Sequence, residues 1–268
     1  MIKSSTGIKL YTKNYLVDKP KANLLLIHGL NEHCERYAHV AKALNFIDVN
    51  VYTYDLRGHG RSEGERSFVK DIDEYREDTE NVYRSIPKNL PFFILGHSMG
   101  GMIAVDFLLF NERTSVSGVI LSGAALEVGE DITPFTKKIV SFLGKIVPHL
   151  RTVKLDPTKI SRDPAQVELY KTDELISLDG AKAGLALALL NAIYKLKKQY
   201  KLFSYPVLIM HGGEDKITNP EGSKALYNQC ISKDKTLHIW EGAYHEIFNE
   251  INKDEVINMM TSWISTRM

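Results

Sequence analysis

The sequence has 268 residues, of which 44% are hydrophobic and 25% charged, a balance that is typical of a folded globular protein and excludes a largely disordered chain. Lys and Arg number 34 against 33 Asp and Glu, so the strong basic excess of a nucleic-acid-binding protein is absent. No apolar run is long enough to span a bilayer, so we expect any membrane contact to be peripheral. Cys34 and Cys230 are the only cysteines, and a reduced, cytoplasmic chain is the simpler expectation, with one bridge between them as the alternative.

Short apolar runs alternate with helical patterns along most of the chain. Unbroken hydrophobic runs of this kind are typical of parallel strands that are buried on both faces. The alternation predicts an α/β fold with a mostly parallel central sheet flanked by helices. The predicted strands are residues 24–27, 49–54, 92–95, 116–121, 206–210 and 237–240, and the predicted helices are residues 71–85, 98–110, 221–230 and 254–265.

The alternation stops between residues 124 and 201. Four prolines interrupt this segment, and its last part, residues 179–198, is rich in Ala and Leu, which favours a well-formed helix. We therefore expect a helical cap insertion at 124–201, with residues 1–123 and 202–268 forming the core.

Residues 96–100 read Gly-His-Ser-Met-Gly and stand between a predicted strand and a predicted helix. A G-x-S-x-G motif at such a junction is typical of a sharp turn that exposes a nucleophilic serine, because small flanking residues make the turn sterically possible. The dipole of the following helix favours the negative charge that develops during acyl transfer. Ser98 is therefore the candidate nucleophile, with a plain glycine-rich turn as the alternative.

A serine hydroxyl needs a neighbouring base, and the base needs a carboxylate that orients it. In this architecture the chain order is serine, acid, histidine. His245 lies in the loop after the last predicted strand, which makes it the best-placed base. Glu214 and Asp215 compete for the acid in the loop after the preceding strand. Asp215 is favoured because its side chain is shorter and lies deeper in the loop, and Glu214 is the reserve.

The oxyanion of the tetrahedral intermediate must be stabilised by preorganised N–H donors. The backbone N–H of Met99, which follows the nucleophile, is one candidate. The second is expected from the loop after the first predicted strand, His28-Gly29-Leu30-Asn31, and Leu30 is our choice. His28 is then expected to shape the loop rather than to act as a base.

Together these segments resemble the α/β-hydrolase superfamily and, within it, the monoglyceride lipases and lysophospholipase-like serine hydrolases. The resemblance rests mainly on HG-x-x-EH-x-x-RY at 28–37, on D-x-R-G-H-G-x-S-x-G at 55–64, and on the motifs at 96–101 and 241–245. It implies an α/β-hydrolase fold with a cap over the site. The common His-Gly-x-Gly of the first loop has Asn31 in place of its second glycine.

Carried over by position, the resemblance implies three groups of site residues. The triad is Ser98, Asp215 and His245, and the oxyanion donors are Leu30 and Met99. The resemblance also implies that Glu32, Arg36 and Tyr170 bind the substrate near the polar end of the pocket.

The resemblance further implies a serine carboxylester hydrolase that cleaves monoacylglycerols to fatty acid and glycerol through an acyl-enzyme. A lysophospholipase, a broad short-chain esterase or acyltransferase, and a non-catalytic ligand-binding protein of the same fold are the alternatives. The expected partner is a small lipid ester, with no nucleic acid. The sequence contains no metal cluster, P-loop or dinucleotide-binding motif, so no metal and no cofactor are expected. The oligomeric state is not predicted.

The insertion offers two lipid-facing candidates. In residues 132–147 the apolar side chains fall near helical spacing and the lysines lie off that face, as in a helix that docks on a lipid surface; a helix that only packs on the domain is the alternative. A second apolar set, which forms either the wall of an acyl-chain pocket or ordinary helix packing, is Leu185, Leu187, Leu189, Leu190 and Ile193.

Overall fold

A seven-stranded sheet forms the centre of the computed structural model, which describes residues 1–4, 6–111, 114–129 and 132–268. The strands lie in the order β11-β10-β7-β6-β4-β5-β3. Neighbouring strands are parallel except β5 and β3, which are antiparallel. The predicted α/β fold is therefore confirmed. The bounds are β3 Thr12–Tyr15, β4 Ala22–Ile27, β5 Val49–Tyr54, β6 Phe92–His97, β7 Gly118–Ser122, β10 Val207–Gly212 and β11 Lys235–Trp240.

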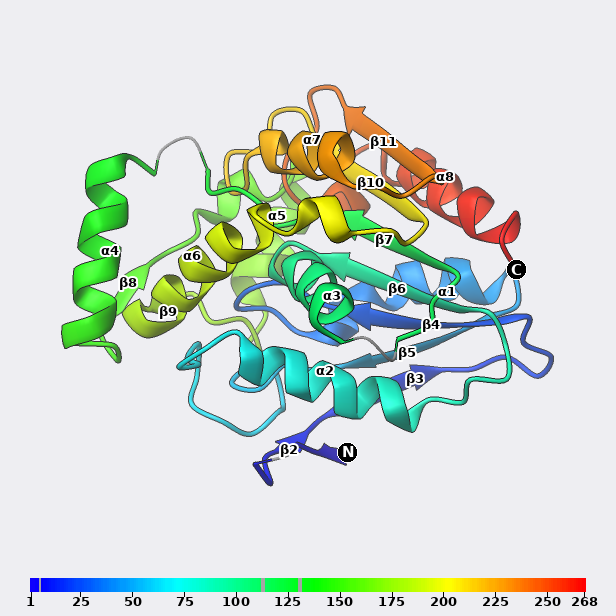
Figure 1. Ribbon diagram of the computed structural model, residues 1–268, viewed down its shortest axis with the longest axis horizontal. Helices are drawn as coiled ribbons and strands as arrows, with labels where there is room; N and C mark the ends of the chain where they lie inside the picture. The colour runs from blue at the N-terminus through cyan, green and yellow to red at the C-terminus, as the bar shows by residue number, and fades with distance from the viewer. Residues whose placement is uncertain (5, 112–113, 130–131) are drawn as a thin grey trace.

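Helices cover both faces of the sheet (Figure 1). The side chains of β4 alternate between two buried clusters, with Leu25 in one and Leu24 in the other. The first cluster includes side chains of α2, α3 and α7, and the second includes side chains of α1 and α8. The bounds are α1 Ala38–Asn45, α2 Asp73–Ser85, α3 Met99–Phe110, α7 Pro220–Gln229 and α8 Lys253–Ser265.

The predicted strands and helices of the core are all present, with ends that move by no more than a few residues. Strand β3 was not predicted because its sequence, Thr-Lys-Asn-Tyr, is polar and lies at the edge of the sheet. Helix α1 was not predicted either. A small antiparallel pair near the N-terminus, β1 (Ile2–Lys3) and β2 (Lys9–Leu10), completes the core.

The chain between β7 and β10 forms a run of short elements, and its last α-helix contributes Leu185 and Leu196 to the first core cluster. Three of its prolines stand at the first residue of a helix, each after a Thr or Asp whose side chain accepts a hydrogen bond from the first turn, an arrangement that starts helices. The elements are α4 Pro134–Ile146, β8 Arg151–Val153, η2 Pro157–Lys159, α5 Pro164–Thr172, β9 Ala181–Lys182, α6 Ala183–Lys197 and η3 Tyr200–Leu202.

Two details of this segment differ from the sequence prediction. The segment is not purely helical, because β8 and β9 pair in antiparallel fashion; both strands are too short, and β8 too polar, to give a pattern. The last helix begins at Ala183 rather than at residue 179, because Gly180 has a φ of 88° and β9 precedes the helix.

The strands of the parallel sheet point toward the side of the molecule where α4, β8, β9 and the start of α6 lie (Figure 1). Open α/β sheets bind their ligands outside the carboxyl ends of the strands. A site between the sheet and the 124–201 segment is therefore the geometric expectation. Among the described residues, no helix combines the length and the apolar character needed to cross a membrane.

Candidate active site

Ser98 occupies the turn between β6 and α3. Its φ of 53° and ψ of −120° lie outside the regions that non-glycine residues ordinarily adopt, and such strain persists only where the surroundings enforce it. The backbone N–H of Ser98 is held by the carbonyl of Ser122 at 2.9 Å. This is the sharp, strained turn that the G-x-S-x-G motif predicts, but Ser98 is buried rather than exposed.

The motif needs glycine at positions 96 and 100 because neighbouring backbone atoms lie too close to leave room for a side chain. A Cβ on Gly100 would lie 2.2 Å from the carbonyl oxygen of Ile27, at the end of the neighbouring strand β4. A Cβ on Gly96 would lie 2.5 Å from the carbonyl oxygen of Gly100. Any side chain at either position would therefore push the start of α3 away from the sheet and displace Ser98.

The three side chains expected to form a triad meet at the carboxyl edge of the sheet. His245 Nε2 lies 2.9 Å from the Ser98 hydroxyl, and its Nδ1 lies 2.7 Å from Asp215 Oδ2. All three residues are buried. The reserve acid Glu214 is exposed and faces Lys216 at 3.4 Å. Of the two competing carboxylates, the structure brings Asp215 to the histidine.

Asp215 is held by a set of donors. Its Oδ1 accepts hydrogen bonds from the backbone N–H groups of Ile217 at 2.8 Å and Thr218 at 3.0 Å. Its Oδ2 accepts from the Thr218 hydroxyl at 2.9 Å and lies 3.1 Å from His211 Nε2. Burial alone would raise the pKa of Asp215, but the facing His245 and His211 outweigh it and hold the pKa well below its usual range. The side chain is therefore an anion that orients His245.

His211 and Thr218 were missed by the sequence analysis. Neither belongs to a motif for this chemistry. His211, in β10, and Thr218, in the loop after it, both contact the same carboxylate oxygen of Asp215. The signal available was position: His211 lies at the carboxyl end of a predicted strand, where ligand-facing side chains gather.

Burial lowers the pKa of His245, but the Asp215 carboxylate more than compensates, so the net pKa lies above its ordinary value. With Asp215 accepting from Nδ1–H, the neutral ring presents Nε2 as an acceptor to the Ser98 hydroxyl. Two other histidines after Ser98 lie away from this site: His149 is exposed beside Glu65, and His238 lies in β11 with its ring 4.2 Å from that of Trp240.

The loop after β4 passes directly beside the nucleophile. A Cβ on Gly29 would lie 3.1 Å from the Cβ of Ser98. Leu30 and Met99 both line the cavity into which Ser98 opens. Met99 is the first residue of α3, so its N–H has no partner within the helix. The placement suits the oxyanion roles expected of Leu30 and Met99, which stay predictions.

His28 and Asn31 shape this loop. His28 is buried, its Nδ1 lies 2.8 Å from the carbonyl of Gly29, and its Nε2 accepts a hydrogen bond from the N–H of Leu56 at 2.9 Å. Asn31 has a φ of 62°, a conformation that asparagine tolerates better than most residues. Its Oδ1 accepts a hydrogen bond from the Ser67 hydroxyl at 2.7 Å. The asparagine therefore keeps the left-handed backbone that a glycine would provide.

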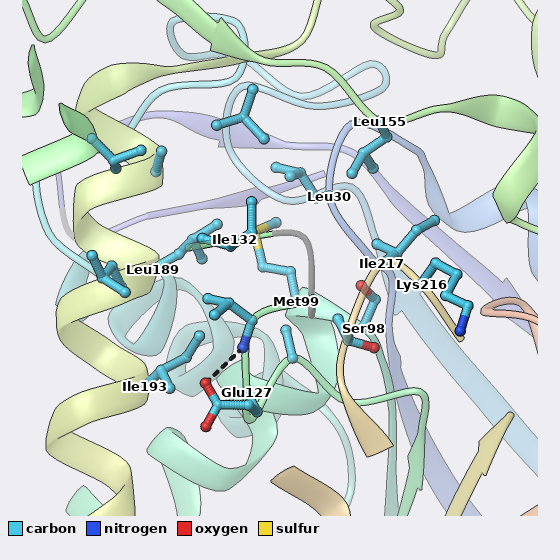
Figure 2. A pocket seen from close by; sticks show the side chains of 18 of the residues that line it. Leu30, Ser98, Met99, Glu127, Ile132, Leu155, Leu189, Ile193, Lys216 and Ile217 are labelled. Carbon is cyan, nitrogen blue, oxygen red and sulfur yellow. Dashed lines mark hydrogen bonds between the residues drawn. The ribbon is translucent and has the colours of Figure 1, made fainter. Parts of the chain in front are cut away.

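Ser98 opens into an apolar cavity of about 320 Å³. In Figure 2, Ser98 and Met99 lie opposite Leu189 and Ile193 of α6, and Ile217 borders the same space. Of the five apolar side chains proposed for the wall, Leu189, Leu190 and Ile193 line the cavity. Leu185 belongs to the core cluster, and Leu187 packs beside Gly144 of α4.

Glu32, Arg36 and Tyr170 lie together, but none of them lines this cavity. Arg36 donates to Glu32 at 2.6 Å, and its guanidinium lies 4.8 Å from the centre of the Tyr170 ring. Arg36 also borders a separate hollow of about 580 Å³. The substrate-binding role of these three residues stays a prediction. Within the described ranges, no group of His, Cys, Asp and Glu side chains is arranged to hold a metal ion.

Comparisons with known proteins agree with this geometry. Residues 18–252 match the family described as serine aminopeptidase, S33. A monoacylglycerol lipase of Mycolicibacterium smegmatis is 34% identical over 252 residues, which cover 93% of this chain and 90% of the relative.

Two solved structures are also similar over almost their whole length. The monoacylglycerol lipase of Paleococcus ferrophilus has a TM-score of 0.89 at 30% identity, covering 97% of this chain and 100% of that one. A soluble variant of the Saccharomyces cerevisiae monoglyceride lipase in complex with a substrate analogue has a TM-score of 0.90 at 25% identity, covering 100% and 95%. The chain therefore belongs to the serine aminopeptidase S33 family of α/β-hydrolases, as a serine hydrolase of the lipase and esterase class.

Proposed function

We propose that the protein hydrolyses monoacylglycerols to fatty acid and glycerol through an acyl-enzyme on Ser98. The observation that carries the proposal is the series of hydrogen bonds from Asp215 through His245 to Ser98, a residue that lines the apolar cavity. The similarity to monoacylglycerol lipases over more than nine tenths of the chain supports the same substrate class.

In the first half of the reaction, the Ser98 oxygen attacks the ester carbonyl while His245 Nε2 takes the hydroxyl proton. The carbonyl oxygen becomes an oxyanion, which the N–H groups of Leu30 and Met99 stabilise by hydrogen bonds. The bond to the glycerol oxygen then breaks, and the imidazolium of His245 returns the proton to that oxygen. The products of this half are free glycerol and an acyl ester on Ser98.

Water completes the cycle by the same route. His245 takes a proton from a water molecule, the hydroxide attacks the acyl carbonyl, and the oxyanion forms again at the same donors. Collapse of the intermediate breaks the bond to Ser98, and the proton on His245 returns to the serine oxygen. The fatty acid leaves, and Asp215 stays ionised throughout because its pKa is held far below neutral pH by the facing His245, against the opposing effect of burial.

The cavity favours a substrate with one acyl chain. Its volume of about 320 Å³ lies at the low end of the range for small-molecule pockets. Its wall along α6 is apolar, and each methylene buried there contributes about 0.8 kcal/mol. A single acyl chain fits this space better than the several chains of a diacyl or triacyl lipid.

The exposed face of α4 supports contact with a lipid surface. None of its side chains is buried, and Phe135, Phe142 and Ile146 are 71%, 64% and 65% exposed. Lys138 and Lys145 lie off this apolar face, as in helices that lie at a membrane interface. We propose that α4 docks peripherally on lipid and brings the cavity, which Val140 of α4 also lines, to its substrate.

The test is turnover of the pure protein against matched series of monoacylglycerols, lysophosphatidylcholines and p-nitrophenyl esters of the same acyl lengths. The proposal predicts the highest kcat/KM for a monoacylglycerol. A higher value for the lysophospholipid of equal chain length would show that the charged head group is preferred and that the enzyme is a lysophospholipase. A preference for short aryl esters would reject a lipid substrate.

A further inference from the structure

A buried chain of charged side chains joins the oxyanion loop to the loop that carries His245. Arg36 donates two hydrogen bonds to the carboxylate of Glu246, each at 2.7 Å, and a third to Glu32 at 2.6 Å. The other oxygen of Glu32 accepts a hydrogen bond from the backbone N–H of Gly29 at 2.5 Å and one from the Tyr37 hydroxyl at 2.7 Å.

The two ends of this chain adjoin the reacting groups. Gly29 directly precedes Leu30, the expected oxyanion donor, and Glu246 directly follows His245. Between them, the guanidinium of Arg36 donates short hydrogen bonds to both glutamates, and its paired N–H groups match the two oxygens of the Glu246 carboxylate. A shift of either loop would therefore have to break charge-assisted hydrogen bonds. The path thus fixes the position of the base, His245, relative to the oxyanion donor.

Fold stability is a weak reason to bury such a group. The side chains of Glu32, Arg36 and Glu246 are only 3%, 10% and 6% exposed, and the cost of desolvating buried ions often exceeds their mutual attraction. Burial raises the pKa of Glu32, but Arg36 outweighs it and brings the pKa to about 2. The pKa of Glu246 is lowered in the same way. Two carboxylates thus share one guanidinium, and the group has a net charge of −1.

We propose that Glu246 is a positioning residue: through Arg36 and Glu32 it fixes the His245 loop against the oxyanion loop, and its charge stabilises the imidazolium that forms during the reaction. The inference rests on the proposed acyl-enzyme function and adds a residue that touches neither the substrate nor Ser98. The residue acts through backbone placement at one end and through electrostatics at the other.

Several charged or titratable groups surround the His245 ring. Asp215 is the dominant anion, and Glu246 and Glu32 add negative charge that also raises the pKa of His245, against the lowering effect of burial. The His97 ring lies 4.8 Å away, and burial together with His245 lowers its pKa to about 4, so it is neutral at working pH. Removing the charge of Glu246 therefore lowers the pKa of His245.

The experiment measures kcat, KM and the pH dependence of kcat/KM for Glu246→Gln on p-nitrophenyl butyrate and on a monoacylglycerol. We expect kcat to fall about 10- to 100-fold, the cost of small misplacements of reacting groups, with KM little changed. The acidic limb of the profile, which reports protonation of the base, should move to lower pH. A wild-type kcat together with an unmoved limb would overturn the inference.

A double-mutant cycle separates this role from general loosening of the loop. Glu250 is a matched control, because it is a buried carboxylate of the same loop that binds Arg162 at 2.9 Å and the N–H of Tyr244 at 2.8 Å. If one path joins the two loops, the losses from Glu32→Gln and Glu246→Gln do not multiply in the double variant, whereas those from Glu32→Gln and Glu250→Gln do. Multiplicative losses in both cycles would contradict the proposal.

A second variant and the activity of the wild-type protein keep the test decisive. If Glu246→Gln does not fold by circular dichroism, Glu246→Asp is used instead: it keeps the charge but shortens the reach to Arg36, so kcat should fall while the acidic limb stays in place, and a wild-type kcat would overturn the proposal. If the wild-type protein does not hydrolyse esters, the proposed function itself fails, a result distinct from any difference among the variants.

Discussion

At the scale of single residues, the site depends on which carboxylate meets His245. Glu214 and Asp215 are neighbours in the loop after the same predicted strand, and the shorter side chain one residue deeper in the loop favoured Asp215. The structure decides the question because the loop turns so that the N–H groups of Ile217 and Thr218 face Asp215, while Glu214 points to solvent. Such a choice depends on the conformation of one loop, which residue type and spacing do not determine.

The first prediction concerns Asp215. Asp215→Asn removes the charge that orients His245 and offers an amide N–H where Nδ1–H needs an acceptor. We expect kcat for ester hydrolysis to fall about 10⁴-fold, the loss seen for the equivalent change in another serine hydrolase, while circular dichroism stays unchanged. Glu214→Gln is the control and should keep wild-type kcat. Equal losses in the two variants would mean that the acid is not Asp215.

The oxyanion loop shows a second limit at this scale. Because Asn31 stands where the family commonly has glycine, the sequence alone did not determine the backbone conformation of this loop. The structure gives Asn31 the left-handed conformation and binds its side chain to Ser67. Ser67 is distant in sequence and buried in the core, so this partner could not be found from a local motif.

At the scale of helices and strands, the hydrophobic pattern located every strand that is buried on both faces and the helices α2, α3, α7 and α8. Most of the elements that escaped bury little apolar surface: β3 is a polar edge strand, and β8 and β9 together have only five residues. Helix α1 also escaped, although it buries Val40, Ala41 and Leu44. The amphipathic pattern of residues 132–147 correctly predicted a helix, α4. Pattern alone left open whether its apolar face packs inward, and the exposure of Phe135 and Phe142 shows that it does not.

The second prediction tests this face of α4. Replacing Phe135 and Phe142 by Ser removes two side chains whose full burial is worth about 1.5–3 kcal/mol each. We expect binding to phosphatidylglycerol-containing vesicles, measured by sedimentation, to weaken about tenfold or more, while turnover of soluble p-nitrophenyl butyrate is unchanged. Phe46→Ser, which removes a phenyl group 80% exposed at the end of α1, should bind vesicles as the wild type does. Unaltered vesicle binding by the α4 variant would contradict docking through this helix.

At the scale of the whole molecule, the pH dependence of stability comes from carboxylates whose pKa values are lowered by folding. Burial raises the pKa values of Glu32, Glu246 and Asp215, but Arg36 beside the two glutamates and the histidines beside Asp215 outweigh it, so each pKa in the folded state lies below its ordinary value. A group of this kind contributes stability above the pKa of the unfolded state, and the contribution is lost as the pH falls toward the folded-state pKa.

The third prediction follows from that sign. The free energy of unfolding in urea should be steady near neutrality and should fall as the pH drops below about 4, the ordinary range of carboxyl pKa values, toward about 2, where Glu32 titrates in the folded state. Glu32→Gln should be less stable at neutral pH and should lose less stability over this interval. Glu214→Gln, which alters an exposed carboxylate, should follow the wild-type slope. A Glu32→Gln curve parallel to the wild type would show that Glu32 does not contribute in this way.

The central claim is that Ser98 forms the covalent bond to the acyl group. The most direct measurement is intact-protein mass spectrometry, followed by peptide mapping, after treatment with a fluorophosphonate ester. The account predicts a single adduct on Ser98, formed by the wild type and lost in Ser98→Ala, which keeps the wild-type circular dichroism spectrum. An adduct on another residue, or labelling of Ser98→Ala at the wild-type rate, would contradict it.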